Sequence, residues 1–204
     1  MIPYSKKQLA RSYDADAIRR SQSSIADWKA GERRYFVGRL REQGGKTILE
    51  IGAGTGRDSL YFKECGFEVT CIDLSEEMVR HCKEKGLNAE VMDFYQLDFA
   101  DQSFDAVYAL NCLLHVPKPE LGQVFAEIRR VLKADGLFYM GVYGGRDSEG
   151  VWENDTCEPK RFFSFYTDEA VQVTVKTYFE LDYFRVVPLQ PDEPHFQSLL
   201  LINK

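Results

Sequence analysis

The sequence lacks any long hydrophobic run. No stretch of about 18 consecutive apolar residues occurs, and no apolar segment of the kind that directs export follows the polar first residues. We therefore expect a cytoplasmic protein that neither spans a membrane nor is secreted. Basic residues are in the minority, with 26 Lys and Arg against 32 Asp and Glu and a net charge of −6. Because a phosphate backbone attracts a basic surface, this charge argues against a nucleic-acid partner.

Patterns typical of metal sites and disulfide frameworks are missing as well. The cysteines are odd in number and never spaced C-x-x-C, and the three histidines form no ligand pattern with them. We expect no bound metal, and thiols that stay reduced in the protein interior. The residues concerned are Cys65, Cys71, Cys82, Cys112 and Cys157, together with His81, His115 and His195.

What the sequence does contain is the composition of a globular protein. Of its 204 residues, 44% are hydrophobic and 28% are charged, which excludes disordered and fibrous classes. The length favours one domain, which would bury roughly 70% of its unfolded surface. Such a chain needs neither a disulfide nor a metal in order to fold, and the sequence leaves open whether it is a monomer or a homodimer.

The N-terminal segment, residues 5–42, is polar and helical in pattern. Its apolar residues Trp28, Phe36, Val37 and Leu40 recur at helical spacing, so they must pack on other parts of the protein. A pair of glycines ends the segment.

Strand and helix patterns alternate from there. Short apolar runs predict buried parallel strands, and the amphipathic stretches between them predict helices. Ser75 is expected to cap one helix and Thr167 another. The predicted strands are 47–51, 68–73, 89–92, 104–110 and 137–143, and the predicted helices are 57–65, 75–86, 119–133 and 167–178.

The end of the chain breaks this alternation. Residues 179–187 and 196–202 predict two more strands, joined by a loop that contains Pro188, Pro191 and Pro194. A helical crossover does not fit into so short a loop, so this pair must be antiparallel. The whole pattern predicts an α/β fold, with a mostly parallel sheet covered by helices on both faces.

The chemistry lies in the loop after the first strand, which reads Glu50-Ile51-Gly52-Ala53-Gly54-Thr55-Gly56-Arg57. Gly52 and Gly54 permit a tight turn and let a ligand lie against bare backbone, while the N-terminus of the next helix attracts an anion. Asp73 ends the second strand roughly 20 residues later, where a carboxylate accepts both hydroxyls of a ribose. This arrangement predicts a nucleotide-like cofactor.

The third glycine distinguishes between cofactors. A dinucleotide-binding loop has the pattern G-x-G-x-x-G and would need glycine at position 57, which here is Arg57. The spacing is instead G-x-G-x-G, ending at Gly56, and Glu50 adds a second acidic group beside the loop. Negative groups at this place suit a cationic cofactor better than a pyrophosphate.

These residues resemble the class I, Rossmann-like S-adenosylmethionine-dependent methyltransferases, from about residue 46 to the C-terminus. The resemblance implies a doubly wound sheet of seven strands in the order 3-2-1-4-5-7-6, with strand seven antiparallel, which agrees with the final pair predicted above. The chain would then comprise an N-terminal helical lid (1–45), a cofactor-binding core (46–143) and a substrate-side region (144–204).

The same resemblance assigns residues to S-adenosylmethionine and its product, S-adenosylhomocysteine. The E-x-G-x-G-x-G loop would hold the methionine part, Asp73 the ribose and Asp93 the adenine amino group, while the leading helices would bring Tyr4 or Tyr13 near the sulfonium. The implied cofactor residues are Tyr13, Glu50, Gly52, Ala53, Gly54, Thr55, Gly56, Asp73, Leu74, Met78, Met92, Asp93, Phe94 and Asn111.

The implied activity is transfer of a methyl group to a small molecule by in-line displacement, with an O, N or C acceptor atom. Candidates for the acceptor pocket are His115, Tyr143, Arg161 and Tyr166, and residues 144–166 would cover it as a lid together with the leading helices. No residue pattern identifies a catalytic base.

The sequence gives less support to other functions. Residues 111–114 read Asn-Cys-Leu-Leu, which departs from the N/D-P-P-Y/F loop of DNA amino-methylases and from the Pro-Cys nucleophile of cytosine methylases. Arg57 argues against an NAD-dependent oxidoreductase. A catalytically idle module that only binds S-adenosylmethionine, or a methylase of RNA or protein, also stays open.

Overall fold

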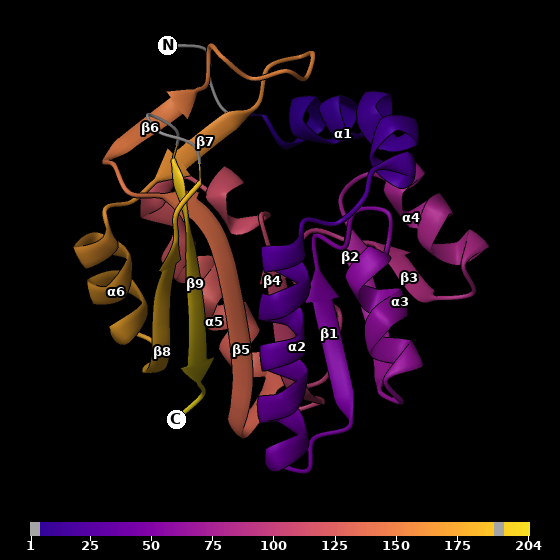
Figure 1. Cartoon of the computed structure of the whole chain (residues 1–204), viewed down its shortest axis with the longest axis vertical. Helices are drawn as coiled ribbons and strands as arrows, with labels where there is room; N and C mark the ends of the chain where they lie inside the picture. Colours follow the sequence, from indigo (N-terminus) through magenta and orange to yellow (C-terminus); the bar gives the residue numbers. More distant parts are fainter. Residues whose placement is uncertain (1–4, 190–193) are drawn as a thin grey trace.

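A seven-stranded sheet, of order β3-β2-β1-β4-β5-β9-β8, forms the centre of the protein, and a two-stranded sheet of β6 and β7 stands beyond its upper edge (Figure 1). The computed structural model describes residues 5–189 and 194–204. Tyr4 and Pro191, named above, lie outside the described residues. The order confirms the predicted 3-2-1-4-5-7-6, because β8 and β9 are the sixth and seventh strands of the main sheet.

The main sheet contains β1 (Thr47–Ile51), β2 (Glu68–Asp73), β3 (Asn88–Val91), β4 (Phe104–Leu110), β5 (Leu132–Gly144), β8 (Glu180–Val187) and β9 (His195–Ile202), and the small sheet contains β6 (Ser148–Val151) and β7 (Phe162–Phe165). The helices are α1 (Lys6–Gln22), α2 (Asp27–Glu42), α3 (Arg57–Glu64), α4 (Glu76–Glu84), α5 (Leu121–Val131) and α6 (Asp168–Lys176), with the 3-10 turns η1 (Leu113–His115) and η2 (Lys118–Glu120). No helix of the described ranges is long and apolar enough to cross a membrane.

Strand pairing follows the prediction. β1 lies between β2 and β4, and both pairs are parallel. β9 runs antiparallel to β5 and to β8, as the short connection required. The carboxyl ends of the parallel strands therefore meet at one edge, the upper edge in Figure 1.

Side chains that alternate along the strands supply two apolar layers. Ile48, Tyr108 and Tyr139 face α2 and α3, whereas Phe138 and Leu199 face α5 and α6 on the opposite side. Both faces are covered, which explains why the central strands are apolar throughout rather than alternating.

The N-terminal segment is helical as predicted, but it forms two helices rather than one. The backbone leaves the helical region at Ser23 and re-enters it after Ala26. Serine hydroxyls compete for backbone hydrogen bonds, and the Ser23 hydroxyl indeed donates to the Arg20 carbonyl (2.9 Å). The break lets α2 lie along the sheet while α1 turns across its upper edge (Figure 1).

The predicted apolar stripe of α2 is confirmed. Phe36, Val37 and Leu40 are buried against the sheet, and Trp28 packs on Phe196 of β9. Most other predicted elements are present with shifts of one to five residues at their ends, for example α5, which starts at Leu121 after a 3-10 turn. The hairpin of β6 and β7 was not predicted, and the substrate-side segment 144–166 contains it.

Asp105, at the amino end of β4, connects the starts of the neighbouring strands β1 and β5. Its carboxylate accepts hydrogen bonds from the Lys46 and Thr47 amides and pairs with Lys133 (2.7 Å). Burial opposes the charged form, but the Lys133 ammonium and these donors hold the pKa of Asp105 well below its ordinary value. The ionised carboxylate therefore stabilises the fold at neutral pH.

We predict that Asp105→Asn lowers the free energy of unfolding by about 2 kcal/mol at pH 7, since hydrogen bonds to a charged acceptor are lost. A depressed folded-state pKa contributes stability above the unfolded pKa of about 4, and this contribution disappears as the pH falls below that value. Urea unfolding of both proteins at pH 7 and at pH 3 should show a difference that shrinks on acidification. A difference that is constant with pH would contradict the prediction.

Candidate active site

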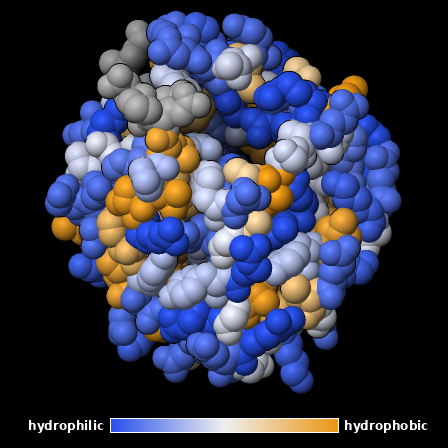
Figure 2. Space-filling model, viewed as in Figure 1, coloured by the Kyte–Doolittle hydropathy of each residue, from blue (hydrophilic) through white to orange (hydrophobic). Residues whose placement is uncertain are grey.

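A cavity of about 450 Å³ opens at the carboxyl ends of β1, β2, β4 and β5. The helix α1 and the loop between β6 and β7 border it from above, and Figure 2 shows this face of the molecule hollowed below them. Such a crevice at the carboxyl edge of an open α/β sheet is where ligands of this architecture bind.

The predicted site residues converge on this cavity. All of the implied cofactor residues line it except Gly56, and all of the acceptor-pocket candidates line it except Tyr166. Gly56 is turned away, because a Cβ there would meet Leu87 and Cys82. Tyr166 lies under Lys118, whose ammonium is 4.8 Å from its ring centre. Neither residue lies on the cavity wall, and the assignment of both to the site stays a prediction.

The glycine loop turns back on itself at the end of β1. Gly52 and Gly54 have φ of 66° and 56°, a backbone conformation that favours glycine. A Cβ at Gly52 would meet the Cys112 side chain at 2.3 Å, whereas a Cβ at Gly54 would find open space. Gly54 thus leaves bare backbone beside the cavity, as the loop pattern predicts.

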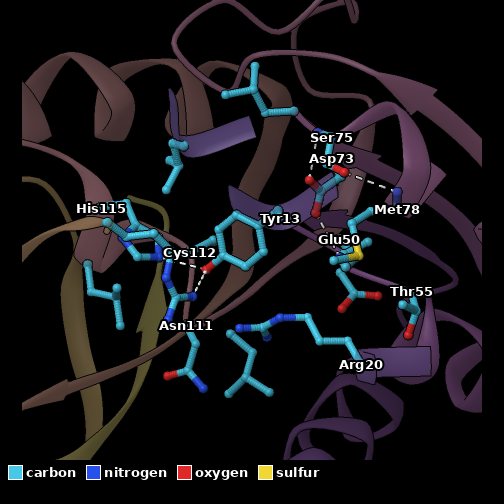
Figure 3. Close-up of a pocket in the computed structure, with 18 of the residues that line it drawn as sticks. Tyr13, Arg20, Glu50, Thr55, Asp73, Ser75, Met78, Asn111, Cys112 and His115 are labelled. Atoms are coloured by element: carbon cyan, nitrogen blue, oxygen red, sulfur yellow. Dashed lines mark hydrogen bonds between the residues drawn. The ribbon is translucent and has the colours of Figure 1, made fainter. Parts of the chain in front are cut away.

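Asp73 ends β2 and holds this turn. Its Oδ2 accepts the Gly54 amide (2.8 Å) and its Oδ1 accepts the Ser75 amide (3.0 Å) (Figure 3). Burial raises the pKa of Asp73, and these amides oppose the rise. A carboxylate offers about four acceptor positions, so Asp73 can still accept a hydrogen bond from a ligand in the cavity.

The sequence predicted Glu50 as an acidic group beside the glycine loop, whereas its side chain is buried in the structure. It is buried beneath the loop and accepts a hydrogen bond from the Ser59 hydroxyl. Burial, with the nearby Asp58 carboxylate second, raises the pKa of Glu50 well above its ordinary value. The residue still lines the cavity, at its base.

Asn111 stands directly after β4 with φ of 56°. Its side-chain Oδ1 is buried on the cavity wall and has no hydrogen-bond partner among the described residues. An unpaired buried acceptor is costly, so this oxygen calls for a donor from a ligand or from solvent.

Three contacts hold α1 over the cavity. Lys6 pairs with Asp93 (2.7 Å), and the Asp14 carboxylate accepts a hydrogen bond from Ser75 (2.5 Å). In the third contact, the Tyr13 hydroxyl lies 2.7 Å from His115 Nε2. The leading helix thus borders the cavity. Asp93 lines the cavity, although its Oδ2 pairs with Lys6 and its Oδ1 accepts the Tyr95 amide (3.0 Å).

The contact between Tyr13 and His115 has a defined direction. A carbonyl only accepts, so His115 Nδ1 must carry the proton that is donated to the Phe162 carbonyl (2.6 Å). His115 Nε2 then accepts the Tyr13 hydroxyl proton, while Arg161 donates to the Tyr13 oxygen (3.0 Å) (Figure 3). Arg161 is itself held by Asp155 (2.6 Å). The chain of contacts joins α1, η1 and the β6–β7 loop.

We predict a pH dependence from His115. Burial lowers the pKa of His115 to about 3, whereas an unfolded histidine has about 6.5. Its contribution to stability is therefore complete above about pH 6.5 and is lost as the pH falls from there toward 3, by up to about 1.4 kcal/mol per pH unit.

The stability difference between wild type and His115→Asn should shrink by about 2 kcal/mol between pH 7 and pH 5, because only the wild type takes up the extra proton on unfolding. Urea unfolding at pH 7, 6 and 5 measures it. If the two unfolding free energies change in parallel, His115 is not buried in its neutral form.

Arg57 stands where a dinucleotide-binding loop would have its third glycine, and its structural role was not predicted from the sequence. Its guanidinium donates to the carbonyls of Arg20 (3.0 Å) and Ser23 (2.7 Å), at the end of α1. The first residue of α3 therefore fixes the connection between α1 and α2. No local pattern reveals this contact, which joins residues more than 30 positions apart.

Further cavity residues were also missed. They come from the lid and its connection and include Lys6, Leu9, Ala10, Arg20, Ser23, Ser24, Ile25, Ala26 and Lys29. The far end of the cavity is aromatic and apolar, with Tyr143, Trp152, Phe163 and Leu114. Within residues 5–189 and 194–204, no group of three His, Cys, Asp or Glu side chains could hold a metal ion.

Comparison with known proteins gives a family match. Residues 48–136 match the family model described as a methyltransferase domain. A phosphatidylethanolamine N-methyltransferase of Cereibacter sphaeroides is 36% identical over 149 residues, which cover 66% of this chain and 71% of that protein. A sterol 24-C-methyltransferase of Gibberella zeae is 33% identical over 141 residues, 65% of this chain but only 36% of that protein's length.

A solved methyltransferase structure shares the fold. A 1,6-didemethyltoxoflavin-N1-methyltransferase of Burkholderia thailandensis superimposes with a TM-score of 0.73 at 21% identity, covering 100% of this chain and 92% of that one. The likeness extends over the leading helices and the β6–β7 hairpin as well as the central sheet.

Proposed function

The chain belongs to the class I S-adenosylmethionine-dependent methyltransferases, and we propose that it transfers the methyl group of S-adenosylmethionine to a small-molecule acceptor held in the cavity. One observation carries the proposal. The glycine loop, the Asp73 carboxylate and the unpaired Asn111 oxygen border a single cavity whose other end is aromatic.

The residues present fit the cofactor. Gly54 leaves room along the backbone, the Asp73 carboxylate on the cavity wall can accept from ribose hydroxyls, and Asn111 offers an acceptor to an ammonium group. Asp93 and the side chains of Met92 and Phe94 would hold the adenine. The family's assignment of the methionine, ribose and adenine subsites is therefore the one we adopt.

S-adenosylmethionine supplies an activated methyl group on a sulfonium when it is bound. The protein's own task is then to orient the acceptor in line with that group, and positioning of this kind contributes on the order of 7–11 kcal/mol. Tyr13 suits the task, because its hydroxyl proton is committed to His115 and its oxygen is held by Arg161. The remaining lone pair of the Tyr13 oxygen can accept a hydrogen bond from a cavity ligand.

The acceptor would occupy the end of the cavity lined by Tyr143, Trp152, Phe163 and Leu114. The ring centres of Trp152 and Phe163 are 5.3 Å apart, and the ring centres of His115 and Phe163 are 4.7 Å apart. These rings present apolar faces, so the acceptor should carry a flat or apolar body next to its nucleophilic atom. The lid of α1 and the 144–166 segment would exclude water during transfer.

The test measures binding and transfer separately. Calorimetry should show binding of S-adenosylmethionine and S-adenosylhomocysteine but not of NAD. Methyl transfer is then followed with radiolabelled S-adenosylmethionine against an acceptor panel that includes phosphatidylethanolamine and a sterol, which are named in two relatives. Binding of NAD without binding of S-adenosylhomocysteine would favour the oxidoreductase alternative. Binding of S-adenosylmethionine without methyl transfer to any acceptor of the panel would favour a catalytically idle module.

A further inference from the structure

Ser75 connects the proposed ribose ligand to a residue outside the cavity. Ser75 is buried, and its backbone amide donates to Asp73 Oδ1 (3.0 Å) (Figure 3). The Ser75 hydroxyl accepts the Met78 amide (3.1 Å) and donates to the carboxylate of Asp14 (2.5 Å). Because a hydroxyl has a single proton, that of Ser75 is committed to Asp14.

Asp14 lies in the middle of α1, 61 positions before Ser75 in the chain. Its Oδ1 also accepts the amide of Glu77 (3.3 Å), so one carboxylate of α1 binds two donors at the start of α4. The first amides of a helix have no partner within the helix, and they favour a negative charge nearby. Asp14 thus completes the cap that Ser75 begins, and it does so from the helix that borders the cavity.

Asp14 does not itself line the cavity. Lys6 and Tyr13 of α1 lie on the cavity wall, whereas Asp14 does not. A contribution of Asp14 to ligand binding must therefore pass through a neighbour. Ser75 is a neighbour that also contacts Asp73, and α1 packs against α4 at this place (Figure 1).

Asp73 can hold a ribose well only if its carboxylate is charged and fixed in place. Burial raises the pKa of Asp73, and the amides of Ser75 and Gly54 oppose the rise. The side chain of Ser75 is itself fixed on two sides, by α4 through the Met78 amide and by α1 through Asp14. Removing the Asp14 carboxylate would release one of these two sides and so loosen a donor that orients Asp73.

We propose that Asp14 is a positioning residue, which acts through Ser75 to hold Asp73 in place for the ribose of the cofactor. The inference rests on the proposed function. It makes ribose binding and the attachment of α1 depend on each other, because any contact that fixes Ser75 also favours the ligand that Asp73 binds. The coupling needs only two hydrogen bonds and one buried serine between the two carboxylates.

Calorimetry with S-adenosylhomocysteine on a double-mutant cycle tests the inference. Asp14→Ala should weaken binding about tenfold when Asp73 is present but less than twofold in the Asp73→Ala background, where the residue that Asp14 positions is gone. Asp14→Asn keeps an oxygen acceptor at the same place and should bind within threefold of the wild type. Asp98→Ala, which removes an exposed carboxylate outside the cavity wall, is the matched control.

A second cycle tests the step through Ser75. Ser75→Ala removes the hydroxyl that joins Asp14 to α4, so Asp14→Ala should change the affinity less than twofold in that background as well. Thermal melts of all variants show whether each is folded. A purely structural role of Asp14 would instead lower the melting temperature and weaken binding by the same factor in every background.

The inference is overturned if Asp14→Ala binds S-adenosylhomocysteine within twofold of the wild type. It is also overturned if Asp14→Ala weakens binding by the same factor with and without the Asp73 carboxylate, because Asp14 would then act by a different route. Failure of the wild type to bind S-adenosylhomocysteine at all would overturn the proposed function instead, and this result is visible before any variant is made.

Discussion

Replacing Asp73 by alanine is expected to lower the affinity for S-adenosylhomocysteine by about 100-fold. The carboxylate lines the cavity, and if it holds both ribose hydroxyls, two charge-assisted hydrogen bonds of roughly 1.5–3 kcal/mol each are lost before solvent compensates. The substitution also removes the acceptor for the Gly54 amide, so the glycine loop itself should loosen. Both effects act on cofactor binding in the same direction.

Calorimetry on Asp73→Ala measures the loss, and a thermal melt shows whether the variant remains folded. Asp98→Ala removes an exposed carboxylate that does not line the cavity and serves as the matched control. An Asp73→Ala protein that melts like the wild type and binds within twofold of it would mean that Asp73 is not the ribose ligand.

Two truncations of the N-terminal segment should behave differently. A chain starting at Ser24 loses only α1, whose contacts are with the cavity rim, so it should fold and bind S-adenosylhomocysteine at least tenfold more weakly. A chain starting at Lys46 also loses α2, and with it Phe36, Val37 and Leu40. At about 1.5–3 kcal/mol for each buried side chain, that loss approaches the whole stability of a typical domain.

The chain starting at Lys46 should therefore fail to fold, and circular dichroism would then show no cooperative thermal transition. Unchanged cofactor affinity in the chain starting at Ser24 would refute a role of α1 in binding. A cooperative melt of the chain starting at Lys46 would show that α2 is dispensable for the fold.

The central sheet could be predicted because its signals are local. Each strand is a short apolar run, and caps such as Ser75, which accepts the Met78 amide, mark where helices begin. The antiparallel final pair followed from the shortness of the loop that connects its strands. The β6–β7 hairpin was missed because its strands have only four residues each, although the aromatic run around Phe163 and Phe165 has strand-like composition.

The cofactor end of the cavity could be located for a topological reason. Glu50 lies one residue before the end of β1, Asp73 ends β2 and Asn111 follows β4, and parallel strands bring these positions to one edge. Their roles remain predictions. At the lid end, the resemblance placed Tyr13 and His115 at the site, but their mutual contact could not be read from the sequence. The two residues are 102 positions apart and meet only because the chain turns at Ser23, after α1.

Arg57 constrains how this chain can evolve. A single change to glycine would complete the pattern G-x-G-x-x-G, but it would also remove the donor that holds the carbonyls of Arg20 and Ser23. An ancestor or a designed variant moving toward a dinucleotide loop would thereby release the helix that closes its own cavity. In this chain the side chain at position 57 and the place of α1 over the cavity are therefore coupled.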